Sequence, residues 1–152
     1  DIGKIGMPER VLKKPGRLTG PELEIFKRHS QLGSRIVSAV TELEEVGRAI
    51  LHHHERFDGG GYPDGLVGER IPLLSRILAV CDAYDAMTSD RPYRDSVPHQ
   101  QAIEEIGRNE GKQFDPAVAQ AFRRLYSAAA PEYPDVPSGL RGLSPEAIRA
   151  GA

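Results

Sequence analysis

The sequence is poor in cysteine, and it lacks tryptophan and any long apolar run. Because Cys81 is the only cysteine, an intrachain disulfide is excluded, and so is a structural zinc site built on clustered cysteines. No run of about 18 apolar residues could cross a membrane as a helix, and no signal-peptide pattern is present. We therefore expect a cytoplasmic protein, and an upstream domain could still tether the parent chain to a membrane.

The sequence also lacks an excess of charge of either sign. Its 152 residues include 20 basic and 22 acidic side chains, which gives a formal net charge of -2. No overall field would attract duplex nucleic acid or an anionic membrane, so any anionic substrate must be held by local cations. The length and the 39% hydrophobic content suit one compact domain.

No alternating run of β-branched residues is long enough to indicate a sheet, so we expect an all-α domain. Thr19 and Glu22 form a predicted capping box, and Asp115 followed by Pro116 predicts a second helix start. The predicted helices span residues 8–13, 21–40, 42–56, 72–89, 98–109 and 116–129. We assign the domain to residues 1–130 and a loosely packed or disordered, Pro/Gly-rich tail to residues 131–152.

One histidine falls within the apolar stripe of a predicted helix. That stripe consists of Leu23, Phe26, Ile36, Val37 and Val40. His29 lies within it and is expected to point inward, and Gly33, one turn later, leaves room for another group to approach. By itself, His29 could equally be a core histidine that is satisfied by a backbone carbonyl.

The block "HHHERFDGGGYP" places three histidines before a glycine-rich loop. If Val46 and Ile50 mark the buried face of the preceding helix, the same face continues to His53 and His54. Helical neighbours diverge by roughly 100°, so these two would serve two adjacent ions rather than bind one ion alike. His52 points away and is expected to be dispensable. A frayed helix end carrying imidazolium is the alternative.

Two acids follow an apolar stripe on a later predicted helix. Leu74, Leu78 and Cys81 define this stripe, and Asp82 and Asp85 continue it. A buried carboxylate needs a partner, which favours a bound cation. One acid could then bind the ion while the other orients a histidine.

An ion pair with Arg76 or Arg91 is the alternative for these acids. Taken together, however, the inward positions and helix ends offer a mixed set of nitrogen and oxygen donors. The set consists of Asp1, His29, His53, His54 and Asp82. Such a set suits iron, manganese or similar ions in a catalytic site. Two ions about 3.5–4 Å apart could activate water and clamp a phosphoester.

Four sequence blocks resemble the HD-GYP subgroup of the HD phosphohydrolase superfamily. They are "DIGKIGMPERVLKKPGRLT", "FKRHSQLG", "HHERFDGGGYPDGLVGERIPLLSRILAVCDAYDAMTSDRPYR" and "GKQFDP", and they cover residues 1 to about 116 in family order. The resemblance implies a helical, metal-dependent phosphodiesterase that hydrolyses a cyclic dinucleotide. Cyclic di-GMP is the most frequent substrate, and linear pGpG or GMP is the product in bacterial second-messenger signalling. Two or three divalent ions, commonly iron or manganese, are implied.

The resemblance also implies roles for individual residues. The implied metal ligands are Asp1, His29, His53, His54 and Asp82, with Asp1 bridging two ions. The implied substrate contacts are Lys4, Arg91, Arg94 and Tyr62, of which Lys4 reaches the scissile phosphate and, with Asp1, is catalytic. Gly61 and Pro63 shape the loop beside the substrate, and Asp85 supports the ligands. Glu55 and Asp58 are expected to brace the turn.

The sequence departs from the family at its start, because the histidine of the HD pair would precede Asp1. We therefore expect a piece of a longer protein, or a truncated domain, that binds metal incompletely and hydrolyses poorly on its own. A receiver or sensor domain upstream, protein partners at the GYP loop and a dimer are all compatible with the family. The alternatives are a catalytically impaired module that binds a cyclic dinucleotide or a protein, and a mononucleotide phosphohydrolase, which "HHERFDGGGYP" and "RPYR" disfavour.

Overall fold

The structure is a computed structural model that describes residues 1–89 and 96–126. Its helical elements are η1 (Ile2–Gly6), α1 (Glu9–Leu12), α2 (Gly20–Val37), η2 (Thr41–Leu43), α3 (Glu44–Leu51), η3 (Gly68–Arg70), α4 (Leu73–Thr88), α5 (His99–Arg108) and α6 (Pro116–Tyr126). Within the described ranges the only β pairing is an isolated bridge between Glu110 and Phe114. The predicted all-α class is confirmed.

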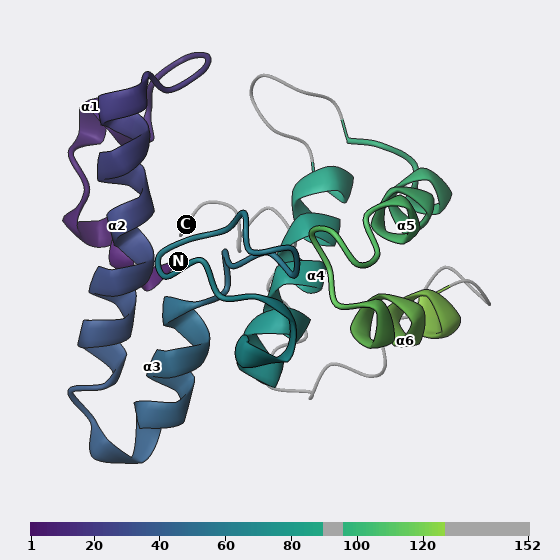
Figure 1. Cartoon of the computed structure of the whole chain (residues 1–152). Coiled ribbons are helices and arrows are strands. Elements are labelled where there is room, and N and C mark those ends of the chain that lie inside the picture. Colours follow the sequence, from purple (N-terminus) through teal and green to yellow (C-terminus); the bar gives the residue numbers. More distant parts are fainter. Residues whose placement is uncertain (90–95, 127–152) are drawn as a thin grey trace, which may run out of the picture.

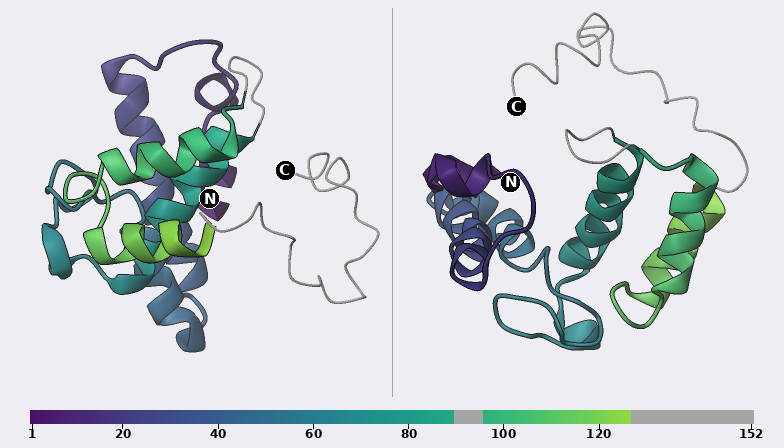
Figure 2. Two further views of the ribbon diagram at one scale, coloured as in Figure 1. Left: turned by 90° about the vertical axis from the view of Figure 1, so that its right-hand side faces the viewer. Right: turned by 90° about the horizontal axis from the view of Figure 1, so that it is seen from above.

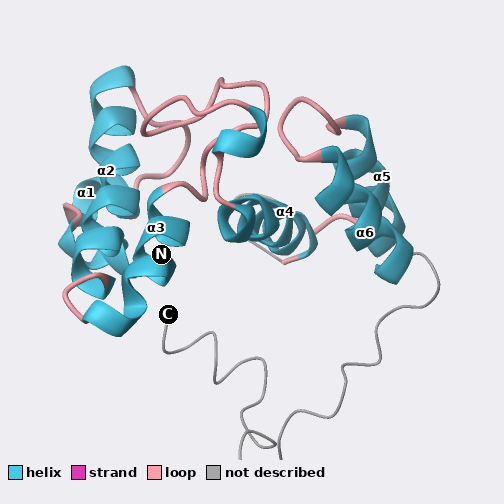
Figure 3. Ribbon diagram, turned by 60° about the horizontal axis from the view of Figure 1, so that its bottom comes forward, coloured by secondary structure: helices cyan, strands magenta, loops and turns pink. Residues whose placement is uncertain are grey.

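The helices form two groups, which meet where α3 packs against α4 (Figures 1 and 3). In the first group α2 packs against α3 and η1, and in the second α4, α5 and α6 pack against one another. Figure 2 shows the amino terminus between α3 and α4. Over the described residues no helix is both long and apolar enough to span a membrane.

The main apolar core lies in the α4–α6 group. It consists of Val80, Ile103, Ile106, Phe114, Ala119 and Phe122. Beside it, an Asp115 carboxylate oxygen accepts the backbone N–H of Ala117 at 2.7 Å and caps α6, as predicted. Asp115 also pairs with Arg76 of α4, so the cap fixes α6 to its neighbour.

The α2–η1 contact depends on the absence of side chains. A Cβ atom on Gly3 would lie 1.9 Å from the carbonyl oxygen of His29, and one on Gly33 would lie 3.1 Å from a methyl group of Ile50. The space that Gly33 was expected to leave is therefore filled by η1 and α3. The predicted capping box is present, with the Thr19 N–H donating to Glu22 at 2.8 Å.

The predicted apolar stripes are largely wrong. Positions expected to be buried but exposed in the structure are Leu23, Ile36, Val40, Val46, Leu74, Leu78 and Cys81. The buried positions of the same helices are His29, Ser30, Gly33, Gly47, Ala49, Ser75 and Val80. Most of these residues are small, which allows the helices to approach closely, so they occupy the contacts between helices. The predicted tail, residues 131–152, lies outside the described residues.

Candidate metal centre

His29 lies on the buried side of α2, with only 1% of its surface exposed. Its Nδ1 is 2.7 Å from the carbonyl oxygen of Phe26. Because a carbonyl only accepts, Nδ1 carries the proton and Nε2 keeps its lone pair. The predicted inward orientation is confirmed, and the carbonyl contact leaves the other ring nitrogen available as a ligand.

The three consecutive histidines do not continue α3, which ends at Leu51 and is followed by a turn at residues 52–54. His53 Nδ1 donates to the carbonyl of Ile50 at 2.6 Å, so its Nε2 is also left available. His54 Nε2 lies 3.2 Å from His29 Nε2. The helix predicted to reach residue 56 is thus about one turn too long.

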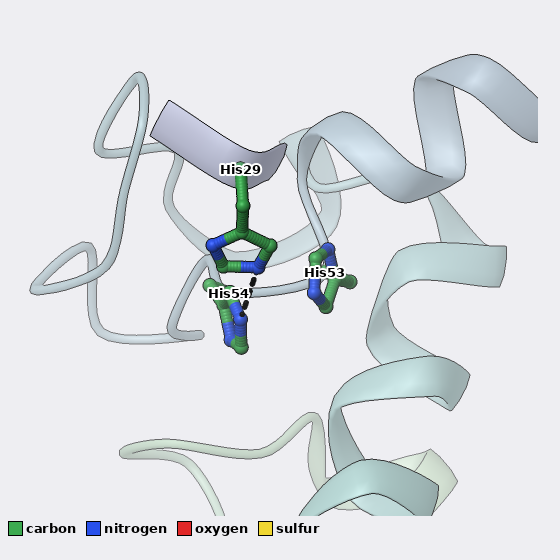
Figure 4. Close-up of side chains that lie close together, drawn as sticks. All are labelled: His29, His53 and His54. Carbon is green, nitrogen blue, oxygen red and sulfur yellow. Dashed lines mark hydrogen bonds between the residues drawn. The ribbon is translucent and has the colours of Figure 1, made fainter. Parts of the chain in front are cut away.

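The turn brings three imidazoles to one place (Figure 4). One nitrogen each from His29, His53 and His54 falls within 4.8 Å of the others, and the His53 and His54 ring centroids are 3.9 Å apart. The expectation that His53 and His54 diverge as helical neighbours is wrong, because neither is helical. All three nitrogens can converge on one cation.

Burial lowers the pKa of each histidine in this cluster. The main cause for His29 and His53 is loss of solvent around the charged ring. For His54, burial and then the neighbouring His53 and His29 lower the pKa to about 3. The rings are therefore neutral near pH 7, which is the form that a metal requires.

Asp1 and Lys4 lie beside the cluster. Asp1 is exposed, and its Oδ1 is 3.7 Å from His29 Nε2. Its Oδ2 accepts the Lys4 ammonium at 2.6 Å, and Lys4 Nζ is 5.7 Å from the centroid of the Phe26 ring. The structure therefore brings the Asp1 carboxylate to the imidazoles and an ammonium to that carboxylate.

Asp82 and Asp85 line a cavity of about 430 Å³ together with Asp1 and His53. Both acids are exposed, so the prediction of buried carboxylates is wrong. The open side of α4, rather than its core side, carries them. Their position on the cavity still places Asp82 beside the histidine cluster. The alternative pairing with Arg76 is also wrong, because Arg76 binds Asp115.

The loop after the histidines is held by a buried acid. Glu55 is 3% exposed and accepts the N–H groups of Asp64 at 2.7 Å and Leu66 at 3.1 Å. Asp58 accepts the N–H of Gly60 at 3.0 Å. The predicted bracing roles of Glu55 and Asp58 are confirmed by these contacts.

The Gly-Tyr-Pro segment packs directly onto the histidine turn. A Cβ atom on Gly61 would lie 2.3 Å from the backbone nitrogen of Arg56, so only glycine permits this approach. The Tyr62 ring centroid is 5.0 Å from that of His54, and Pro63 lines a neighbouring polar cavity. Tyr62 thus covers the His54 side of the cluster.

His52 is separate from the cluster, but it is not frayed. Its Nδ1 is 3.1 Å from the Arg48 carbonyl, and its Nε2 is 2.9 Å from Asp64 Oδ2. It ties the end of α3 to the loop. No sequence pattern predicts this contact, because its partners are twelve positions apart. Arg91 and Arg94 lie outside the described residues, and their roles stay predictions.

Comparison with known proteins places the chain in a family. The HD domain model matches residues 1–118. The chain is 48% identical to a cyclic di-GMP phosphodiesterase of Thermotoga maritima over 127 residues, which cover 82% of this chain and 34% of that protein. It is 46% identical to the cyclic di-GMP phosphodiesterase response regulator RpfG of Xanthomonas campestris pv. campestris, over 82% of this chain and 33% of that protein.

A solved structure supports the fold. The crystal structure of a Vibrio cholerae cyclic GMP-AMP-specific phosphodiesterase, V-cGAP3, matches with a TM-score of 0.55 at 22% identity, over 78% of this chain and 31% of that one. The chain spans about a third of the length of the curated relatives it matches. Divalent metal binding is implied by the HD domain and fits the histidine cluster. The resemblance seen in the sequence is confirmed, and the chain belongs to the HD domain family.

Proposed function

We propose that this chain carries the catalytic centre of a metal-dependent phosphodiesterase that hydrolyses a cyclic dinucleotide. Cyclic di-GMP is the proposed substrate, and pGpG or GMP the product, in bacterial second-messenger signalling. The observation that carries the proposal is the convergence of three neutral imidazoles beside a cavity lined by Asp1 and Asp82. The names of the similar relatives support the substrate class.

The donor set fits two or three divalent ions, with iron or manganese as the proposed species. His29, His53 and His54 would supply nitrogens, and Asp1 and Asp82 would supply oxygens. His29 and His53 are already oriented by carbonyl contacts at 2.7 and 2.6 Å. Bound ions would supply Lewis acidity, polarising the phosphodiester and acidifying the attacking water.

Side chains around the cluster would position the substrate. The Lys4 ammonium, held 2.6 Å from Asp1, would neutralise charge on the scissile phosphate and could donate a proton to the leaving oxygen. Tyr62 would keep His54 in place and limit access of water from the loop side. Arg91 and Arg94 are proposed to grip a substrate phosphate, and Asp85 to support the ligands.

The proposal is tested with His53→Ala and Asp82→Ala. We expect each variant to lose bound manganese or iron and at least 100-fold in cyclic di-GMP turnover, because each removes a proposed ligand. Bound metal is measured by mass spectrometry and turnover by chromatography, in this chain and in a version extended upstream. Glu45→Gln, at an exposed position of α3, is the control.

If circular dichroism shows that the variants stay folded, the loss of metal and turnover is due to the removed ligand. Unchanged turnover in both variants would exclude the proposed centre. If the version extended upstream binds cyclic di-GMP without turning it over, a binding module is supported instead. A receiver or sensor domain in the parent protein is proposed as the regulatory input, in line with the response regulator among the relatives.

A further inference from the structure

A second cavity is lined in part by Tyr62, whose ring contacts His54 of the histidine cluster. It measures about 390 Å³ and lies between α2 and the Gly-Tyr-Pro segment. Its lining includes Glu24, Lys27, Arg28, Gln31, Tyr62 and Pro63. Polar side chains thus dominate a hollow that shares no lining residue with the cavity of Asp1 and Asp82.

Lys27 is the cation that connects this hollow to the cluster. Its Nζ lies 5.6 Å from the centroid of the Tyr62 ring, and that ring also contacts His54. Lys27 precedes His29 by two residues on α2. Because both belong to one helix, the backbone positions of Lys27 and His29 are fixed relative to each other, and the long Lys27 side chain reaches the hollow from this helix.

The present partner of Lys27 is easily replaced. Lys27 Nζ is 2.7 Å from Glu24 Oε1, and the two side chains are 33% and 65% exposed. Exposed pairs of this kind contribute little to stability. A phosphate that offers several acceptor oxygens can therefore take the ammonium from Glu24, and the Tyr62 ring keeps the ammonium near by a cation–π contact.

We propose that this hollow is the subsite for the second, uncleaved phosphate of a cyclic dinucleotide, with Lys27 as its main contact and Arg28 as an additional cation. The inference rests on the proposed function. A cyclic dinucleotide carries two phosphates, and only one can lie at the metal centre during cleavage. Since the chain has a net charge of -2, the other phosphate also needs local cations.

The test removes the charge of Lys27 in one variant and the charge of Glu24 in another. Lys27→Gln should weaken cyclic di-GMP binding to the manganese-loaded version extended upstream about tenfold, because a charge-assisted hydrogen bond to phosphate is lost. Glu24→Gln should tighten binding about twofold, because the competing carboxylate is removed. Affinity is measured by calorimetry.

Lys13→Gln is the matched control. Lys13 is also a lysine paired with a glutamate a few residues before it, with Nζ 2.6 Å from Glu9, but it does not line the hollow. This variant removes the same charge and should leave affinity within twofold. Bis(p-nitrophenyl) phosphate is a small diester with one phosphate. On Lys27→Gln, its KM should rise by a smaller factor than the Kd for cyclic di-GMP.

The outcomes separate the inference from the function on which it rests. Equal effects of Lys27→Gln and Lys13→Gln, or equal losses for cyclic di-GMP and the small diester, would overturn the second-phosphate subsite while leaving the phosphodiesterase intact. If the version extended upstream neither binds nor cleaves cyclic di-GMP, the proposed function fails and the subsite fails with it. Unchanged melting temperatures show that the variants fold.

Discussion

The two helical groups are stabilised in different ways. The α4–α6 group encloses a cluster of apolar side chains, whereas the α2–α3 group buries polar or small residues such as His29, Ser30 and Gly33. The first is a conventional hydrophobic core, and the second depends on close backbone contact and hydrogen bonds. The difference separates the group that supplies stability from the group that supplies the imidazoles.

The largest effect is expected from a substitution in the hydrophobic core of the α4–α6 group. Ile106→Ala removes a side chain that is fully buried in the α4–α6 core and should lower the free energy of unfolding by about 2–5 kcal/mol, through lost burial and a cavity. Urea denaturation measures it. Leu125→Ala, at a position 77% exposed, should change stability by less than about 0.5 kcal/mol. Equal effects would contradict the assignment of the core.

A smaller effect is expected from overpacking the other group. Gly3→Ala would place a Cβ atom 1.9 Å from the carbonyl oxygen of His29, so η1 must move away from α2. The expected cost is about 1–3 kcal/mol, together with weaker metal binding, because Asp1 moves with η1. Gly20→Ala, where no atom lies within 4 Å, is the control. Metal affinity that survives in Gly3→Ala would show that Asp1 is not needed as a ligand.

The smallest effect is a pH dependence that should belong to the histidine group alone. The pKa of His54 is lowered to about 3 by burial and by its histidine neighbours, against about 6.5 in an unfolded chain. The unfolded state therefore binds protons more readily. Stability of the metal-free chain is full above pH 6.5 and declines below it, by about 1 kcal/mol between pH 6.5 and 5.5.

Urea midpoints at pH 7.5, 6.5 and 5.5 with a chelator measure this decline. His54→Gln should reduce the slope but not remove it, since one proton-binding group is lost while the pKa values of His29 and His53 are also lowered by burial. The same slope in the variant would assign the effect to another residue. Metal affinity of the folded chain should fall only as the pH approaches the folded pKa of about 3, because protons and the ion then compete for the His54 nitrogen.

The features predicted correctly from the sequence are those set by local contacts. Thr19 with Glu22 and Asp115 with Pro116 mark helix starts through hydrogen bonds within a few residues, so their sequence patterns are sufficient. The all-α class follows from helical periodicity. The inward position of His29 was also predicted, and the structure confirms it with 1% exposure.

The errors arise where contacts between distant segments decide the outcome. Leu74 and Leu78 were assigned to the core because they are apolar, but Ser75 is buried instead, with its hydroxyl donating to the Ala49 carbonyl at 3.0 Å. The end of α3 at Leu51 is set by the loop, where His52 binds Asp64. Neither partner is close in sequence, so periodicity carries no signal for them.

The carbonyl contacts of His29 and His53 have a consequence for the choice of ion. Both rings are fixed in tautomer and orientation by the backbone of their own turns, so they present the same nitrogen geometry to any cation. The carboxylates of Asp1 and Asp82 are exposed and can rotate to adjust their distance and denticity. In the proposed metal centre, discrimination between one divalent ion and another would therefore fall to the oxygen ligands, while the nitrogen ligands would fix where the ion sits.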